Sequence, residues 1–151
     1  MTPRGIRNNN PLNIRRGGSA WVGLKKRQTD KDFCQFVTID YGYRAAFKLM
    51  QTYFEKYGVR SMADLIGRWA PPAENRTAEY VATVLYDIGR QGYDYDSRQP
   101  LPTPARDKSL WCAIARAMLR RECGAAAAAS PYAPDDISRG YDLAFVTTSI
   151  K

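Results

Sequence analysis

The sequence predicts a mostly α-helical fold with a minor β part near its start. Several segments place apolar residues at the three-and-four spacing of an amphipathic helix, whereas one short run is rich in aromatic and β-branched residues. A chain of 151 residues that is 44% hydrophobic is long enough for one core and too short for two ordinary domains. We therefore expect a single domain, with a loop- and β-rich part over residues 1–40, a helical core over 41–124 and a tail over 125–151.

The N-terminal part is polar, basic and rich in turn signals. The stretch "RRGGSAWVGLKKR" is typical of an irregular loop or of a weak hairpin around Gly17 and Gly18. Residues 33–39, "FCQFVTI", predict a short strand, because aromatic and β-branched side chains suit a pleated, half-buried surface.

Two helices are predicted in the first half of the core. The first ends before Gly58, a natural C-terminal cap, and its apolar positions are Tyr43, Ala46, Phe47, Met50, Tyr53, Phe54 and Tyr57. Ser61 with Asp64 three places later resembles a capping box that opens a second, short helix. Pro71 and Pro72 end this helix.

Two further helices are predicted in the second half of the core. The segment "ENRTAEYVATVLYDIG" places its apolar residues on one face and ends at Gly89. After a loop, Thr103 as the N-cap and Pro104 at the first helical position predict a long helix that ends at Gly124. Alanines 125–129 extend that helix or begin the tail, in which "LAFVTT" is strand-like.

The formal charge of +8 predicts a partner with a wide negatively charged surface, such as nucleic acid, an anionic membrane face or an acidic polymer of the bacterial cell wall. No apolar run is long enough to span a membrane, and the N-terminus lacks the apolar core of a secretion signal. We therefore expect a protein made in the cytoplasm without a signal peptide and no membrane partner. Cys34, Cys112 and Cys123 match no metal or disulfide framework, so free thiols are expected.

The chain contains no histidine. Ser-His-Asp and Cys-His nucleophile pairs need an imidazole base, and typical catalytic zinc sites use at least one histidine, so the usual forms of these mechanisms are excluded. We expect no cofactor and no metal site. An enzyme of this composition works through carboxylates.

The stretch "RWAPPAENRTAEY" contains the first candidate catalytic group. A double proline fixes the direction in which Glu74 and Asn75 project. Beside Trp69 and the prolines, the Glu74 carboxyl would be partly desolvated and suited to act as a general acid in glycosidic bond cleavage, with Asp40 as the second carboxylate. The alternatives are that Glu74 and Asn75 cap the following helix and that Asp40 is a turn or helix-entry residue.

The asparagines of "RGIRNNNPLNIRR" are candidate ligands for a sugar. Each amide offers a donor and an acceptor that suit sugar hydroxyls and N-acetyl groups, although the same groups also form turns. Aromatic rings near these segments are candidates for stacking on sugar faces or bases. The candidate substrate-binding residues are Asn8, Asn9, Asn10, Asn13, Trp21, Arg44, Trp69, Asn75 and Tyr80. Without an interleaved base-stacking pattern, the sequence argues against nucleic acid as the partner.

Several of these stretches together resemble a family of small phage and prophage proteins that are often described as virion or structural proteins. The resemblance covers roughly residues 4–90 and is carried by "RGIRNNNPLNIRR", "WVG", "FCQFVTIDYGYRAAFKLMQTYFEKYG" and "RWAPPAENRTAEY". The order of features is also similar, more distantly, to bacterial wall glucosaminidases of the lysozyme-like superfamily. In those enzymes the catalytic glutamate lies upstream of the asparagine segment, whereas "MTPRGIR" has no acidic residue.

The resemblance implies a lysozyme-like fold and peptidoglycan glycan strands as the partner. We expect a muramidase, glucosaminidase or lytic transglycosylase of phage, prophage or injected-effector type, with Glu74 replacing the missing acid. It would act in the periplasm or on the cell wall, in some forms from a virion, and an injected toxin would have a cognate immunity protein. The alternatives are a non-enzymatic virion structural or cell-wall-binding protein and a basic nucleic-acid-binding module.

Overall fold

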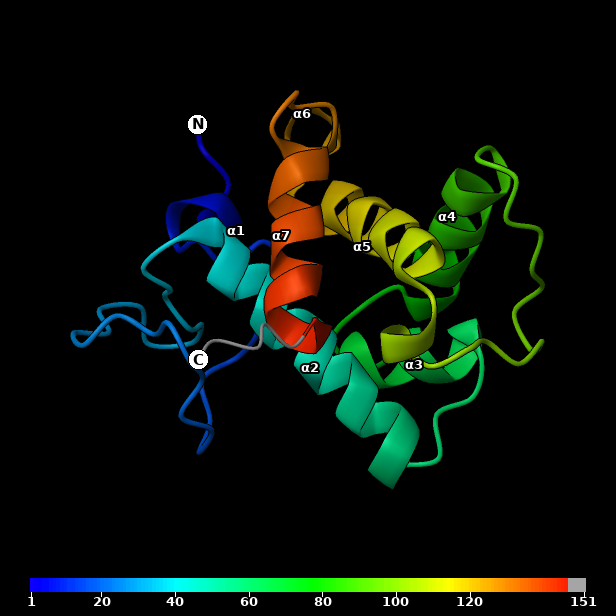
Figure 1. Ribbon diagram of the computed structural model, residues 1–151, viewed down its shortest axis with the longest axis horizontal. Helices are drawn as coiled ribbons and strands as arrows, with labels where there is room; N and C mark the ends of the chain where they lie inside the picture. The colour runs from blue at the N-terminus through cyan, green and yellow to red at the C-terminus, as the bar shows by residue number, and fades with distance from the viewer. Residues whose placement is uncertain (147–151) are drawn as a thin grey trace.

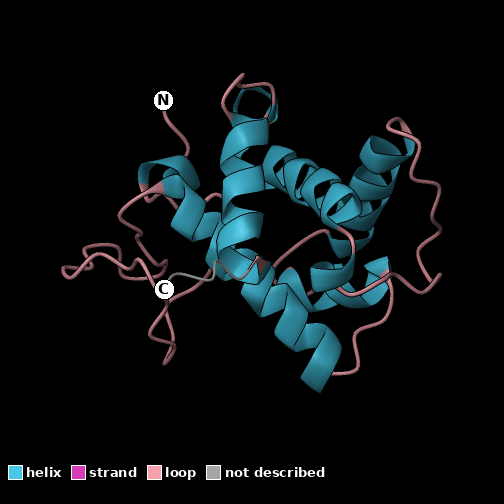
Figure 2. Cartoon of the chain, viewed as in Figure 1, coloured by secondary structure: helices cyan, strands magenta, loops and turns pink. Residues whose placement is uncertain are grey.

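Helices dominate the fold, as the sequence predicts (Figures 1 and 2). The structure is a computed structural model that describes residues 1–146, and these residues form seven α-helices and one 3-10 turn. Their bounds are α1 Arg4–Arg7, α2 Ile39–Lys56, α3 Met62–Trp69, α4 Thr77–Gly89, η1 Pro104–Arg106, α5 Lys108–Cys123, α6 Ala125–Ala128 and α7 Ala133–Phe145.

Helix α7 makes the most extensive helix–helix contact of the molecule, against α2 (Figure 1). At the crossing a Cβ on Gly140 would overlap Tyr43 and lie 2.9 Å from the carbonyl oxygen of Asp40, so the small residue permits the close approach. Phe47 packs edge to face on Tyr141 with ring centroids 5.3 Å apart. The described part of the predicted tail is therefore a core element, and residues 143–145 of its strand-like run end α7; residues 147–151 lie outside the described residues.

The centre of the core lies between α2, α3, α4 and α5. Trp111 is completely buried, its ring meets Phe54 edge to face at 5.4 Å, and its Nε1 donates to the carbonyl of Pro102 at 2.9 Å. The indole thus buries a large apolar surface without leaving its single donor unpaired. Trp111 fixes the loop before η1 to the middle of the molecule.

Local signals set most helix ends correctly. Ser61 Oγ accepts a bond from the Asp64 amide at 3.2 Å and opens α3 as predicted. The long fifth helix starts later than expected, because Pro104 opens only the short turn η1 and Asp107 caps α5 by accepting from the Leu110 amide at 3.1 Å. Thr103 therefore caps η1 by position and not the long helix.

The minor β part is smaller than predicted. Within residues 1–146 it consists of two isolated antiparallel bridges, one between Arg15 and Phe33 and one between Leu24 and Phe36, and no continuous strand. The carbonyls of Cys34 and Phe36 accept bonds from asparagine side chains, at 2.9 and 3.1 Å, in place of a regular ladder. The predicted strand over 33–39 is therefore wrong, and its last residue already begins α2.

Candidate functional site

Two asparagines of the N-terminal segment are buried and hold the loop together. The Asn10 amide donates to the carbonyls of Ile14 and Cys34 at 2.9 Å each and accepts from the Ile14 amide at 2.9 Å. Asn8 donates to Asp30 at 3.0 Å and accepts from Gln35 at 3.2 Å. Both side chains are buried and form their hydrogen bonds within the chain. They therefore have a structural role and are not accessible to a surface polymer.

Asn9 and Asn13 have positive φ, at 52° and 56°, a conformation that asparagine tolerates better than most residues. The Asn9 amide donates to the carbonyl of Phe36 at 3.1 Å, and its backbone carbonyl lies where a Cβ on Gly42 would stand. Asn9 therefore docks the loop on α2. Asn13 differs from the other three, because it is one of the residues that line a surface groove.

That groove joins three segments that are far apart in sequence. It has a volume of about 270 Å³ and is lined by Asn13, Ile14 and Arg15 from the N-terminal loop, Leu49 and Tyr53 from α2, and Arg68, Trp69, Pro71 and Glu74 from the end of α3 and the loop after it. The predicted site residues that it brings together are Asn13, Trp69 and Glu74.

Aromatic side chains form one wall of the groove. The rings of Tyr53 and Trp69 meet edge to face with centroids 6.2 Å apart, and Trp69 Nε1 donates to the carbonyl of Leu12 at 3.2 Å. The Arg68 guanidinium lies over the rings of Tyr53 and Tyr57, at 4.8 and 4.0 Å from their centroids. This wall is fixed by its own contacts before any ligand arrives.

Glu74 is more exposed than the sequence predicts. Its side chain is 56% exposed and forms an ion pair with Arg15, at 2.9 Å between Oε1 and Nη2. The expected desolvation by Trp69 and the prolines is therefore wrong, because the loop turns the carboxyl outward toward arginine. The loop itself is closed by bonds to the Pro71 carbonyl, from the Glu74 amide at 3.0 Å and from Asn75 Nδ2 at 3.2 Å. Asn75 thus stabilises the loop.

Asp40 lies in another part of the molecule. It stands in the first turn of α2 and accepts a bond from Thr38 Oγ1, as a helix-entry residue does. Leu49, the nearest groove residue on that helix, is nine positions later, which is about 14 Å along the axis. The predicted pairing of Asp40 with Glu74 is therefore wrong. Arg44, also on α2, and Trp21, in the N-terminal loop, do not line the groove either.

The acidic residue that the sequence did not indicate is Glu122. Its Oε1 accepts from Asn13 Nδ2 at 2.8 Å and its Oε2 accepts from the Tyr80 hydroxyl at 2.9 Å. Burial raises the pKa of this carboxyl above its ordinary value, against smaller opposing effects of the two hydrogen bonds. Its place in the last turn of α5, where the helix dipole disfavours a carboxylate, was the signal available in the sequence.

Tyr80, predicted to stack on sugar, is a buried residue of α4 whose hydroxyl serves Glu122. Burial also raises the pKa of Tyr80 well above its ordinary value. The Arg121 guanidinium lies 5.5 Å from its ring centroid. Tyr80 therefore helps to hold Glu122, the hydrogen-bond partner of Asn13, and has no face free for a ligand.

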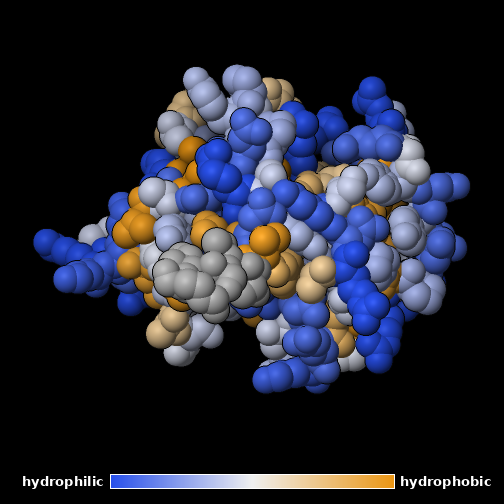
Figure 3. Space-filling view, viewed as in Figure 1, coloured by the Kyte–Doolittle hydropathy of each residue, from blue (hydrophilic) through white to orange (hydrophobic). Residues whose placement is uncertain are grey.

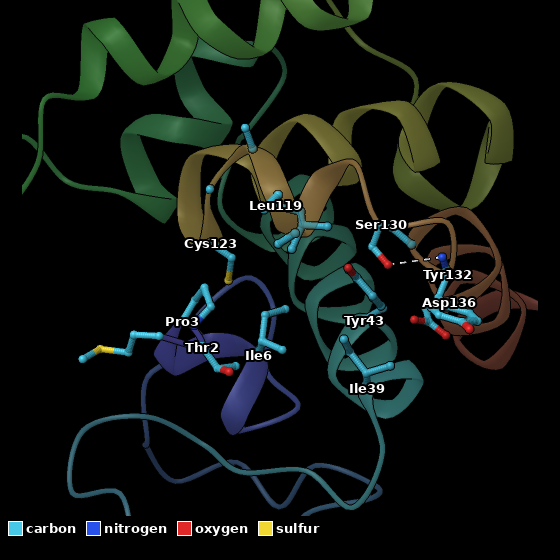
Figure 4. A pocket seen from close by; sticks show the side chains of 16 residues that line it. Thr2, Pro3, Ile6, Ile39, Tyr43, Leu119, Cys123, Ser130, Tyr132 and Asp136 are labelled. Carbon is cyan, nitrogen blue, oxygen red and sulfur yellow. Dashed lines mark hydrogen bonds between the residues drawn. The ribbon is translucent and has the colours of Figure 1, made fainter.

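A larger crevice of about 900 Å³ lies between the N-terminus, the start of α2 and the α5–α7 region (Figure 4). Its lining is mainly apolar, with Ile6, Ile39 and Leu119 among the labelled residues, and the Tyr43 hydroxyl and the Asp136 carboxyl supply polar atoms. Burial raises the pKa of both Tyr43 and Asp136. None of the predicted site residues lines this crevice.

Two other features are absent from residues 1–146. No group of three or more Cys, Asp or Glu side chains is arranged to hold a metal ion there. Across the same residues, no helix combines the length and the apolar character that crossing a membrane requires. The face drawn in Figure 3 is mostly hydrophilic, with apolar side chains scattered over it.

Comparison with known proteins shows a similarity to a phage protein. The chain is 35% identical over 145 residues to Protein P5 of Pseudoalteromonas phage PM2, and the aligned region covers 94% of this chain and 82% of that protein. No family model matches the chain.

Proposed function

The chain belongs to the family of Protein P5 from Pseudoalteromonas phage PM2, and we propose that it is a peptidoglycan-degrading protein that acts on glycan strands, as a hydrolase or a lytic transglycosylase. A virion-associated location, a lysozyme-like arrangement and action on the wall from the periplasm or from outside the cell belong to the same proposal. The groove that contains Asn13, Trp69 and Glu74 is the proposed site.

The observation that supports this proposal most directly is the composition of the groove. Two aromatic rings, two arginines and one carboxyl group meet in a hollow of about 270 Å³, which Asn13 also lines. Charged groups suit sugar hydroxyls and N-acetyl groups, and aromatic rings suit the apolar faces of pyranose rings. These groups come from three segments, so their convergence is a property of the fold.

Glu74 is the proposed catalytic carboxyl group. An exposed ion pair contributes at most about 1 kcal/mol, so a glycan strand can separate Arg15 from Glu74 at little cost. A strand lying in the groove would shield the Glu74 carboxyl from water and place it beside a glycosidic bond. The protonated group would donate to the glycosidic oxygen as the C–O bond breaks. In a transglycosylase the resulting carboxylate then removes the proton of the sugar hydroxyl that closes the new ring, so no second carboxylate is required.

The ion pair between Arg15 and Glu74 also favours a second candidate, a virion or wall-binding protein without turnover. An arginine partner stabilises a carboxylate over a carboxylic acid. In that function the same groove holds a glycan strand and Glu74 accepts hydrogen bonds from sugar hydroxyls.

Purified sacculi distinguish the two candidates. Loss of turbidity with the wild-type protein, and its absence with Glu74→Gln, supports the enzyme, and mass spectrometry of the released fragments separates reducing ends from anhydro ends. Glu79→Gln is the matched control, because Glu79 is 58% exposed and paired with Arg76 but lies outside the groove. Sacculus binding without release of fragments by either protein supports the second candidate, and the absence of binding refutes both.

A further inference from the structure

The groove that contains Asn13, Trp69 and Glu74 is called the glycan groove below, after its proposed ligand. A cationic surface lies apart from it, between α4 and α5. Two adjoining hollows, of about 520 and 460 Å³, share Asp87 and Arg120. The charged residues that line them are Asp87, Arg90, Arg116, Arg120 and Arg121, and we call this set, together with Tyr86, the arginine surface. Four guanidinium groups against one carboxylate leave a strongly positive surface.

Contacts within the chain hold each of the four arginines. Arg120 pairs with Asp87 at 2.8 Å, and Arg116 Nε donates to the carbonyl of Ala128 at 2.9 Å. Arg121 lies over the Tyr80 ring at 5.5 Å and Arg90 over the Tyr86 ring at 6.0 Å. Guanidinium groups that are already positioned lose less conformational entropy when an anion binds, and their planar donors match phosphate oxygens.

The Tyr86 ring distinguishes this surface from a general positive charge. Tyr86 is 65% exposed, one of the most exposed large hydrophobic residues of the described part of the chain, and it lines the same hollow as Arg120 and Arg121. Thr83 lies three residues before Tyr86 and Arg90, the C-cap of α4, lies four residues after it, so both are on the same side of the helix as the ring. Exposed rings between arginines are the combination by which proteins bind single-stranded nucleic acid, through base stacking and phosphate contacts.

We propose that the arginine surface binds single-stranded nucleic acid, with phosphates at Arg90, Arg120 and Arg121 and a base stacked on Tyr86. An acidic wall polymer or an anionic lipid face would use the arginines and have no need of the ring. The sequence concealed this pattern because Tyr86 and Arg90 come from α4 and its C-cap, whereas Arg120 and Arg121 come from α5, and their interleaving exists only in the folded chain.

The test uses fluorescence anisotropy of a labelled oligothymidine of about a dozen nucleotides, a length within the known range of site sizes. Arg90→Glu/Arg121→Glu is compared with Lys26→Glu/Arg27→Glu, which makes the same change of net charge on exposed residues of the N-terminal loop. We expect the first pair to weaken affinity at least about tenfold and the second by less than about threefold. Tyr86→Ala is expected to weaken binding about fivefold or more. Circular dichroism checks that each variant is folded.

Three outcomes would overturn the proposal. These are equal losses in the two charge-reversed proteins, an affinity for oligothymidine that Tyr86→Ala leaves unchanged, and binding only to sacculi or to phosphatidylglycerol vesicles. The glycan groove is not involved, so Glu74→Gln should bind oligothymidine as the wild-type protein does. Failure of the glycan proposal therefore leaves this one standing, and the reverse also holds.

Discussion

Asn13 donates a hydrogen bond to Glu122 across 109 positions of the chain, at 2.8 Å between Nδ2 and Oε1. The same asparagine lines the glycan groove, so the acidic residue at the end of α5 fixes one wall of the proposed site from behind. The Asn13 Oδ1 is buried without a hydrogen-bond partner among the described residues and lies close to Gly5. The orientation of this side chain therefore rests on its bond to Glu122.

Replacing Glu122 by Gln is expected to make stability less dependent on pH. Burial raises the folded-state pKa of this carboxyl above its ordinary 4.5, so the folded protein binds the proton more tightly than the unfolded chain. The resulting stability is complete below the unfolded pKa and is lost as the pH rises through the folded pKa. The free energy of unfolding of each protein is measured in urea at about pH 4 and about pH 7. The difference, variant minus wild type, should be more positive at the higher pH. Equal differences at both pH values would contradict this assignment.

The stability that Asp30 contributes is expected to depend on pH in the direction opposite to that of Glu122. Its side chain, only 9% exposed, accepts two bonds from Arg4 at 2.6 and 2.7 Å, which hold its pKa well below the ordinary 3.8. Its contribution is present above the unfolded pKa and is lost as the pH falls below about 4. Asp30→Asn should lower the free energy of unfolding by roughly 2 kcal/mol at neutral pH.

The control for Asp30 is Asp32→Asn. Asp32 also contacts Arg4, at 3.2 Å, but its side chain is 41% exposed, so we expect a loss below about 1 kcal/mol. If chemical denaturation shows the same loss in the free energy of unfolding for both variants, the hydrogen bonds of Asp30 contribute less to stability than predicted.

Gly140→Ala tests whether α7 is a core element. The added Cβ would overlap Tyr43 at the crossing of α2 and α7, so we expect a loss of about 2 kcal/mol or more in the free energy of unfolding. Gly67→Ala is the matched control, because Gly67 lies inside α3 with open space around it. That change should stabilise the protein by about 0.5 to 1 kcal/mol. A neutral Gly140→Ala would mean that α7 packs loosely.

Arg15→Gln is expected to separate stability from glycan binding. The ion pair with Glu74 is exposed on both sides, so the free energy of unfolding should change by less than about 1 kcal/mol. Loss of a charged group from the groove should weaken sacculus binding roughly tenfold. Arg76→Gln removes a similar exposed partner from Glu79, outside the groove, and co-sedimentation should find its affinity unchanged.

The predictable part of the fold is the part that local chemistry controls. Apolar spacing and the Ser61 cap located α2, α3 and α4 closely, because an amphipathic face and its terminal caps are encoded within one turn or two. Helix α7 was missed because Pro134 and Gly140 interrupt its pattern. Pro134 fits the first turn, and Gly140 is required by the contact with α2.

The candidate site was predictable only in part. The segments of Asn13, Trp69 and Glu74 do meet, but the direction of Glu74 depends on Arg15, a partner 59 positions away. Glu122 was not found because its partners, Asn13 and Tyr80, come from two other parts of the chain. Hydrogen bonds of this span leave no periodic trace in a sequence.

The crossing of α2 and α7 also bears on how the chain folds during synthesis. Helix α2 leaves the ribosome early, yet the surface that Gly140 and Tyr141 cover stays open until nearly all described residues have been made. Contacts that join distant parts of a chain form late, because the intervening loop must first be ordered. An apolar face that stays exposed during synthesis is a binding surface for chaperones. It is also a surface through which a truncated product would aggregate.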